Sequence, residues 1–315
     1  MRVQLYRGSG VWLVGLWLVL AFSARAEPLF QDQPFSRDRA VLDEVAQTYK
    51  QSGTALGERI GSMLEISDVP FALMPYEQNY LLWSHTDSIN RDAYRQSGSD
   101  IADGLDQTEA KYQLSLMFPL WRGILGQRSA LSASYSQLAL WQAANGDISA
   151  PFRETNYEPQ LFLVLLPQIK WGGWSFDWLE VGINHQSNGR SEPLSRSWNR
   201  IYANMSIERN RWVINFKPWY RIPESRNDDD NPDITDYLGH YRLSLAYRAH
   251  DQVLTALTRY NWDTRRGSLE LGWSYPLTPR VRFYTQFFSG YGDTLIDYNH
   301  YQNRIGIGLM LNDLL

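Results

Sequence analysis

The chain has 315 residues and a formal net charge of −4 at pH 7, and it contains no cysteine. The slight acidic excess argues against a nucleic-acid partner, which would need a basic patch, and the absence of cysteine excludes disulfides and thiolate chemistry. Aromatic residues make up 14% of the sequence although the mean hydropathy is −0.42, a combination typical of membrane β-barrels, in which polar lumen-facing residues alternate with apolar lipid-facing ones.

Residues 1–26 are predicted to be a signal peptide for export. Two arginines precede an apolar stretch at 11–22, and Ala24-Arg25-Ala26 has the form of a cleavage site. A membrane anchor is the alternative, but the stretch is shorter than the roughly 20 residues that span a bilayer. Cleavage would remove three arginines and no acidic residue, leaving a net charge of about −7. No apolar run of 18 residues follows, which excludes a helical membrane protein.

Residues 27–70 show no strand-like alternation and are predicted to form an N-terminal periplasmic segment, partly helical around 42–49. From residue 71 to residue 315, apolar and polar side chains alternate in runs separated by turn-rich segments. Such alternation indicates β-strands, because successive side chains of a strand point to opposite faces. Twelve strands are predicted, near 71–83, 110–120, 130–141, 159–170, 174–185, 198–208, 212–219, 237–248, 252–261, 266–276, 280–290 and 303–312.

An even number of strands fits a closed membrane barrel, because closure leaves no unpaired strand edge in hydrocarbon. A soluble β-sandwich would show the same alternation. The predicted export signal, the strand lengths and the aromatic residues near strand ends favour the membrane (Trp121, Trp141, Trp171, Trp174, Trp219 and Tyr291). We therefore predict an all-β fold: a 12-stranded antiparallel transmembrane β-barrel of the bacterial outer membrane. Its extracellular loops are expected at 142–158, 186–197, 220–236 and 291–302, and its periplasmic turns are short.

The apolar face of the strand predicted at 174–185 ends in a histidine and a serine. Val181 and Ile183 share a face with His185, and Ser187 continues the same parity. In a membrane barrel the apolar face is the one that meets lipid. His185 and Ser187 are therefore expected on the outside of the barrel, near its extracellular rim.

Asn199 has the same placement on the next predicted strand, because it shares a face with Ile201 and Ala203. A nucleophilic hydroxyl needs a base within hydrogen-bond reach, and the base needs a third group that fixes its tautomer. Ser187, His185 and Asn199 are candidates for such a triad. A neutral amide suits the third position, since a carboxylate beside hydrocarbon would carry a heavy desolvation cost. The alternative is that the three are ordinary polar residues of a loop rim.

Gln137 also falls on an apolar face. It shares that face with Leu131, Ala133 and Tyr135, so its amide is expected to point into the lipid near the middle of the membrane. A buried amide needs a hydrogen-bond partner, and a second copy of the chain would supply one. The alternative is a shifted register that places Gln137 in the lumen.

The residues around the candidate triad resemble the signature of the outer-membrane phospholipase A family. The resemblance is carried by Asn184-His185-Gln186-Ser187-Asn188-Gly189-Arg190 and by Ser195-Arg196-Ser197-Trp198-Asn199-Arg200. Further matching motifs lie at 118–123, 151–160, 217–220, 230–235 and 295–298, so the resemblance covers roughly residues 71–315.

This resemblance implies a twelve-stranded barrel that hydrolyses acyl esters of phospholipids and lysophospholipids in a calcium-dependent reaction. It implies Ser187 as the nucleophile, His185 as the general base and Asn199 as the residue that orients the base. The backbone N–H of Gly189, together with calcium-bound water, would meet the oxyanion.

The resemblance also implies the calcium site and the assembly. One calcium ion (Ca²⁺) per active site would be held by the backbone carbonyls of Arg190 and Ser195 and completed by Ser149 of a second subunit. Oxygen ligands of this kind suit calcium. The enzyme would be dormant as a monomer and active as a homodimer, with Gln137 in the dimer interface.

Two other functions remain open at this point: a passive porin or structural barrel, and a lipid A deacylase. An acidic run at 228–233 could bind calcium, but it lacks the glycine of an EF-hand loop, and we interpret it as a solvated loop.

Overall fold

The computed structural model describes residues 35–67, 69, 72–98, 101–225 and 227–312. The predicted signal peptide, at 1–26, lies outside the described residues, as does the beginning of the predicted periplasmic segment. Residues 42–315 form one compact unit.

Two helices precede the barrel, α2 (Phe35–Lys50) and α3 (Ala55–Ser67). The predicted helical stretch at 42–49 lies within α2, whereas α3 was not predicted. A barrel residue, Glu208, accepts hydrogen bonds from Thr54 Oγ1 at 2.5 Å and from the Leu56 backbone N–H at 3.1 Å. A carboxylate at this position satisfies free N–H groups at the start of α3 and interacts favourably with the helix dipole.

No helix in the described part of the chain is both long enough and apolar enough to cross a bilayer.

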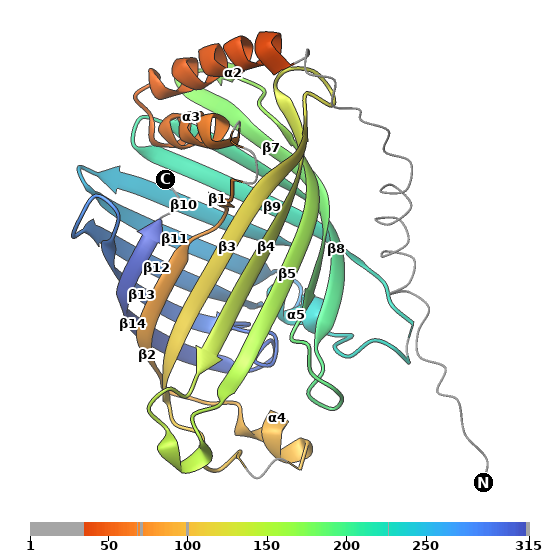
Figure 1. The fold of residues 1–315 in the computed structure, drawn as a ribbon. Helices are drawn as coiled ribbons and strands as arrows, with labels where there is room; N and C mark the ends of the chain where they lie inside the picture. Colours follow the sequence, from red (N-terminus) through yellow and green to blue (C-terminus); the bar gives the residue numbers. More distant parts are fainter. Residues whose placement is uncertain (1–34, 68, 70–71, 99–100, 226, 313–315) are drawn as a thin grey trace. The chain divides into compact units, whose positions relative to one another are not determined.

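Twelve long antiparallel strands among the described residues close into a barrel, with β14 pairing back to β2 (Figure 1). They are β2 (Asn79–Thr86), β3 (Thr108–Arg122), β4 (Ser129–Trp141), β5 (Phe152–Leu165), β7 (Trp174–Ser187), β8 (Ser197–Arg209), β9 (Trp212–Ile222), β10 (Tyr241–Ala249), β11 (Gln252–Asn261), β12 (Arg266–Pro276), β13 (Arg282–Tyr291) and β14 (Tyr301–Asn312). Two short strands are added to this ring: β1 (Met74–Pro75) pairs with β3, and β6 (Ile169–Trp171) pairs with β7. The predicted 12-stranded antiparallel barrel is confirmed.

Long loops and short turns lie at opposite ends of the barrel. The long loops include the helices α4 (Arg91–Gln96) and α5 (Ile234–Leu238) and the 3₁₀ turn η1 (Gly146–Ile148). In Figure 1, α4 and α3 lie at opposite ends of the barrel. The β6–β7 turn is tight, and both of its residues, Gly172 and Gly173, have positive φ. This asymmetry is typical of outer-membrane barrels, in which the longer loops are extracellular.

The prediction was wrong about β5. A loop was expected at 142–158, but β5 begins at Phe152. The segment looked like a loop because it is polar, yet its polar side chains face the lumen and find partners there. Glu154 accepts a hydrogen bond from the Ile296 N–H at 3.2 Å, and Asn156 accepts one from the Leu295 N–H at 2.8 Å. Polar residues are therefore built into this strand rather than solvated in a loop.

The first predicted strand, at 71–83, is also different: β1 ends at Pro75 and β2 starts at Asn79. Between them the Tyr76 side chain is buried and donates a hydrogen bond from its hydroxyl to Glu180 at 2.8 Å. The segment that contains Tyr76 therefore separates the two strands.

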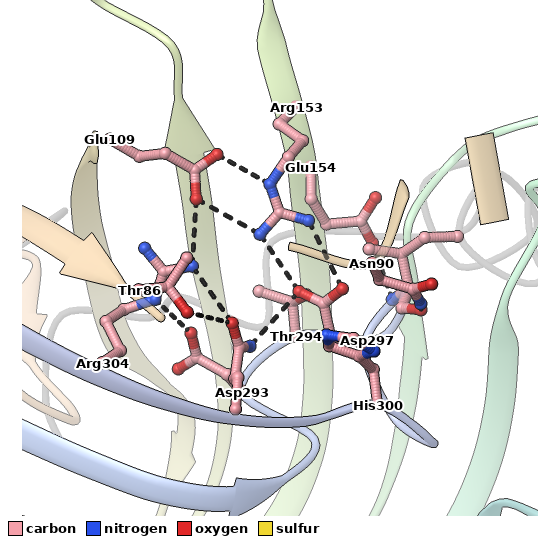
Figure 2. A network of polar contacts seen from close by, with 12 residues as sticks. Thr86, Asn90, Glu109, Arg153, Glu154, Asp293, Thr294, Asp297, His300 and Arg304 are labelled. Atoms are coloured by element: carbon pink, nitrogen blue, oxygen red, sulfur yellow. Dashed lines mark hydrogen bonds and ion pairs between the residues drawn. The ribbon is translucent and has the colours of Figure 1, made fainter. Parts of the chain in front are cut away.

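A network of buried ion pairs occupies the long-loop end of the lumen (Figure 2). Glu109 on β3 binds Arg153 on β5 at 2.6 Å and Arg304 on β14 at 2.9 Å. Arg304 also binds Asp293 at 2.7 Å, and Arg153 binds Asp297 at 3.1 Å. All five side chains are at most 1% exposed. Such charges are stable only because each one is paired.

Asp293 and Asp297 belong to the β13–β14 loop, at 292–300, which is folded into the lumen. Besides its contacts with β5, this loop accepts a hydrogen bond at Gly292 O from Arg259 on β11 at 2.7 Å. The loop therefore bridges well-separated strands of the ring. A passive porin requires an open lumen, whereas ion-paired side chains and the loop at 292–300 lie within this end of the barrel.

Candidate active site

The candidate triad lies on the outer face of the barrel, at the long-loop end. On β7, Val181 and Ile183 are 47% and 52% exposed, whereas Glu180 and Asn184, on either side of this pair, are 1% and 4% exposed. His185 and Ser187 follow in the exposed parity and are half-buried. The alternation expected from the sequence is therefore present, and it places both side chains on the lipid-facing side.

Strand pairing brings Asn199 opposite His185. The two residues are direct partners in the β7–β8 ladder, and Ser187 is opposite Ser197. His185 Nδ1 and Asn199 Oδ1 are 2.9 Å apart. Because an amide oxygen can only accept, this hydrogen bond requires a proton on Nδ1 and leaves the lone pair on Nε2. That is the tautomer a general base needs.

The far side of Asn199 contacts a residue that sequence reasoning missed. Asn199 Nδ2 donates to Glu224 Oε1 at 2.7 Å. Glu224 is half-buried in the β9–β10 loop. Burial raises the pKa of the Glu224 carboxyl above its usual range, and the hydrogen bond from Asn199 opposes that shift.

No hydrogen bond joins the Ser187 hydroxyl to His185 within the part of the chain that the structure describes. Both side chains nevertheless leave the same face of β7 two residues apart. Catalytic hydrogen bonds are often long in the free enzyme and shorten when substrate is bound. The arrangement is thus compatible with a serine and its base.

Gly189 follows the strand in a left-handed conformation, with φ of 65°. A Cβ at this position would lie 3.2 Å from the Tyr157 ring. Among the contacts of the described residues, the Gly189 N–H donates no hydrogen bond, so it is free to meet an oxyanion. Glycine is required here both for its φ and for the space beside Tyr157.

The loop at 188–196 is braced from within. Asn188 Oδ1 accepts the backbone N–H groups of Arg190 at 3.3 Å and Arg196 at 3.0 Å, and Asn188 Nδ2 donates to Leu194 O at 2.8 Å. One central amide therefore organises the loop that contains both carbonyls predicted to bind calcium.

A second loop supports it from outside. Ser195 Oγ donates to Asp230 at 2.5 Å, and the Ser197 N–H donates to Asn231 Oδ1 at 2.9 Å. Within the run at 228–233, Asp230 and Asn231 thus brace the 188–196 loop and the first residue of β8. The interpretation of this run as a solvated loop did not include that role.

The residues present fit a calcium ion. In the described chain the Arg190 carbonyl accepts no hydrogen bond, and the Ser195 carbonyl accepts one only from the Arg196 guanidinium, at 2.5 Å. A cationic group thus already lies against one of the two carbonyl oxygens. Among the described residues there is no cluster of three or more histidine, aspartate or glutamate side chains suited to a metal. Backbone carbonyls are hard oxygen ligands of the kind calcium accepts.

Ser149 lies on a different loop from these carbonyls. It follows η1 in the β4–β5 loop, is exposed and has a φ of 64°. No contact joins it to Arg190 or Ser195 within the described residues of the same chain. Its exposure leaves the hydroxyl accessible to a second molecule.

Gln137 is on the outer face, as predicted. Its neighbours Ser134 and Ser136 point inward: Ser134 is 3% exposed, and Ser136 Oγ lies 2.7 Å from Ser115 Oγ. Gln137 Nε2 donates to the Tyr112 hydroxyl at 2.9 Å. Its oxygen accepts a long hydrogen bond from the Tyr135 hydroxyl at 3.5 Å. The amide therefore has partners within its own barrel, which was not predicted from the sequence.

A row of side chains joins Gln137 to the candidate nucleophile. Gln137 is paired with Tyr157 on β5, and Tyr157 is paired with Ser187 on β7. Two strand spacings separate the ends of the row, about 10 Å. Tyr157 was not singled out from the sequence because its segment was interpreted as a loop, although its parity within β5 would have placed it here.

The family model for phospholipase A1 matches residues 56–311. The chain belongs to the phospholipase A1 family.

Members of the phospholipase A1 family resemble this chain over most of its length. Phospholipase A1 of Klebsiella pneumoniae is 52% identical over 258 residues, which cover 82% of this chain and 88% of that protein. An active-site mutant of Escherichia coli outer membrane phospholipase A, with an asparagine replaced by alanine, matches with 50% identity and a TM-score of 0.79, covering 83% of this chain and all of that one. The dimer of the Salmonella typhi outer membrane phospholipase with bound calcium matches with 50% identity and a TM-score of 0.75, covering 78% and 94%.

Membership in the phospholipase A1 family confirms three predictions made from the sequence: the family itself, a carboxylic ester hydrolase, and a location in the outer membrane. The passive porin and the lipid A deacylase are not supported.

Proposed function

We propose that this chain hydrolyses the acyl esters of phospholipids and lysophospholipids within the outer membrane, using Ser187, His185 and Asn199. The observation that carries this proposal is the hydrogen bond between His185 and Asn199 on the lipid-facing side, two residue pairs along the β7–β8 ladder from Ser187. A lipid in the membrane would reach these groups without leaving the bilayer.

Each residue has one chemical task in the reaction. Ser187 Oγ attacks the ester carbonyl carbon while His185 Nε2 takes the hydroxyl proton. Asn199 accepts from Nδ1–H and keeps the imidazole oriented. The proton then passes to the departing alcohol oxygen, which releases the lysophospholipid and leaves an acyl-serine. Water, activated by His185, cleaves this ester and releases the fatty acid.

The Gly189 N–H, which donates no hydrogen bond among the described residues, would donate to the oxyanion of the tetrahedral intermediate. A preorganised donor at this place is worth roughly 10²- to 10³-fold in kcat. The position of this N–H donor depends on the left-handed backbone of Gly189, which lies beside Tyr157.

Calcium would be held by the carbonyl oxygens of Arg190 and Ser195 and by Ser149 of the partner subunit, one ion per active site. When bound, calcium supplies positive charge near the developing oxyanion. The calcium-bound dimer of the Salmonella typhi relative supports this assignment, as do the positions of both carbonyls on one braced loop. The Arg196 guanidinium would leave the Ser195 carbonyl when calcium binds.

The active form would be a homodimer with Gln137 in its interface. The row Gln137–Tyr157–Ser187 supports this, because a second barrel against Gln137 would stand about two strands from the nucleophile. The groove between two barrels would then receive the acyl chain of the substrate.

The test is release of fatty acid from phospholipid in mixed micelles by the wild type and Ser187→Ala, each with calcium and with a chelator. We expect activity only for the wild type with calcium. Undiminished activity of Ser187→Ala would overturn the triad, and undiminished activity in chelator would overturn the calcium assignment.

A further inference from the structure

We infer that Glu224 is a positioning residue that fixes the amide of Asn199 and, through it, the tautomer of His185. The inference rests on the proposed function and deepens it: the hydrogen-bonded chain runs from His185 through Asn199 to Glu224.

Glu224 lies on the same lipid-facing side of the barrel as the triad. On β9, Ile222 is the ladder partner of Asn199. Glu224 is two residues beyond Ile222, so it continues the lipid-facing stripe past the end of the strand. This brings its carboxylate to Asn199 Nδ2 at 2.7 Å, while Asn199 Oδ1 lies 2.9 Å from His185 Nδ1.

The carboxylate of Glu224 determines which end of the Asn199 amide faces His185. An ionised carboxylate only accepts hydrogen bonds, so the NH₂ end of Asn199 must face Glu224. The oxygen end must then face His185, which requires the proton on Nδ1 and leaves Nε2 as the base. An amide without such a neighbour could turn over by 180° and donate to Nδ1, which would favour the opposite tautomer.

Asp228, Asp229 and Asp230 of the same loop have partners of their own. Arg221 binds Asp229 at 2.5 Å, and Asp230 accepts from Ser195. Asp228 accepts from Ser225 at 2.6 Å and is exposed. Glu224 is thus the carboxylate of this loop that contacts the triad, and Asp228 is a matched control on the same loop.

The experiment measures kcat and KM for fatty acid release by four folded proteins: wild type, Glu224→Ala, Glu224→Gln and Asp228→Ala. We expect Glu224→Ala to lower kcat about tenfold at unchanged KM, the size of one lost hydrogen bond. Glu224→Gln keeps an acceptor oxygen and should restore kcat to within about threefold of the wild type. Asp228→Ala should match the wild type.

Three results would overturn the inference: wild-type kcat for Glu224→Ala, a Glu224→Gln variant as slow as Glu224→Ala, or an effect on KM alone. A double-mutant cycle sharpens it. In the Asn199→Ala background, Glu224→Ala should cause no further loss, because its only route to His185 has gone; additive losses would also overturn it.

Ser187→Ala, measured in parallel, separates this inference from the proposed function. An inactive Ser187→Ala with a fully active Glu224→Ala would refute the role of Glu224 alone. An active Ser187→Ala would refute both.

Discussion

The two faces of the same strands differ in what their polar residues do. Inside the long-loop end of the barrel, Glu109 is fully buried and bound to the buried side chains of Arg153 and Arg304. Outside, His185 and Asn199 are half-exposed and share one hydrogen bond, and Ser187 has no hydrogen bond to His185 within the described chain. Satisfied polar groups stabilise a fold, whereas groups with free donors and acceptors can act on a substrate. In the proposed mechanism, the alternation of side chains along each strand places the stabilising residues in the lumen and the catalytic residues on the outer face.

The largest contrast is expected between adjacent residues of β7. His185→Ala should lower kcat by at least roughly 10³-fold, because the base is removed, and should leave the free energy of unfolding within about 0.5 kcal/mol. Asn184→Ala should do the reverse: its amide bonds to Glu158 and to Arg200 in the lumen, so we expect a loss of about 1–3 kcal/mol of stability with kcat nearly unchanged. Denaturant unfolding in detergent and fatty acid release measure both quantities. Equal effects of the two variants on kcat would break the comparison.

Glu109→Ala tests the inner face at its centre. It leaves Arg153 and Arg304 buried without their shared partner, and we expect about 3–5 kcal/mol of destabilisation. The activity of the protein that remains folded should be close to that of the wild type. If Glu109→Ala is as stable as the wild type, the ion-pair network does not hold the loop at 292–300 in the lumen.

Gly189→Ala should have a smaller effect, on the outer face only. A Cβ would strain the left-handed backbone and press on Tyr157, which moves the oxyanion donor. We expect kcat to fall roughly 10- to 100-fold, somewhat less than complete loss of such a donor, with KM little changed. Wild-type kcat would mean that this N–H does not meet the oxyanion.

Gln137→Leu should have the smallest effect. The amide already bonds to Tyr112 in its own barrel, so the dimer should lose only about 0.6–1.7 kcal/mol. Sedimentation equilibrium in detergent with calcium measures this difference. Unchanged association of Gln137→Leu would place the interface on another face of the barrel.

The alternation of side chains between the two faces of a strand made much of this structure predictable. Apolar alternation alone placed His185 and Asn199 on the outside of paired strands, because a strand admits only two faces. The same rule failed for β5, where Glu154 and Asn156 face a polar lumen and the pattern resembles that of a loop. In a membrane barrel polar side chains can face the lumen rather than the outside. A strand such as β5, with many lumen-facing polar residues, therefore shows only a weak strand pattern in the sequence.

Contacts made by loops could not be predicted. Glu224 reaches Asn199 from a different hairpin, and the loop at 292–300 reaches β5 across the lumen. Neither contact follows from sequence spacing, because each depends on the path of a loop after the barrel has closed. The available signal was that Glu224 follows Ile222 by two residues and therefore continues the face of the strand that carries Ile222.

The most direct measurement is covalent labelling of the nucleophile. A lipid-like organophosphonate, presented in mixed micelles with calcium, should modify one serine of the wild type, and peptide mass spectrometry should locate the label on Ser187. Labelling should abolish fatty acid release and should be lost in His185→Ala. A label on another residue, or a fully labelled protein that still releases fatty acid, would contradict the claim that this outward-facing serine performs the hydrolysis.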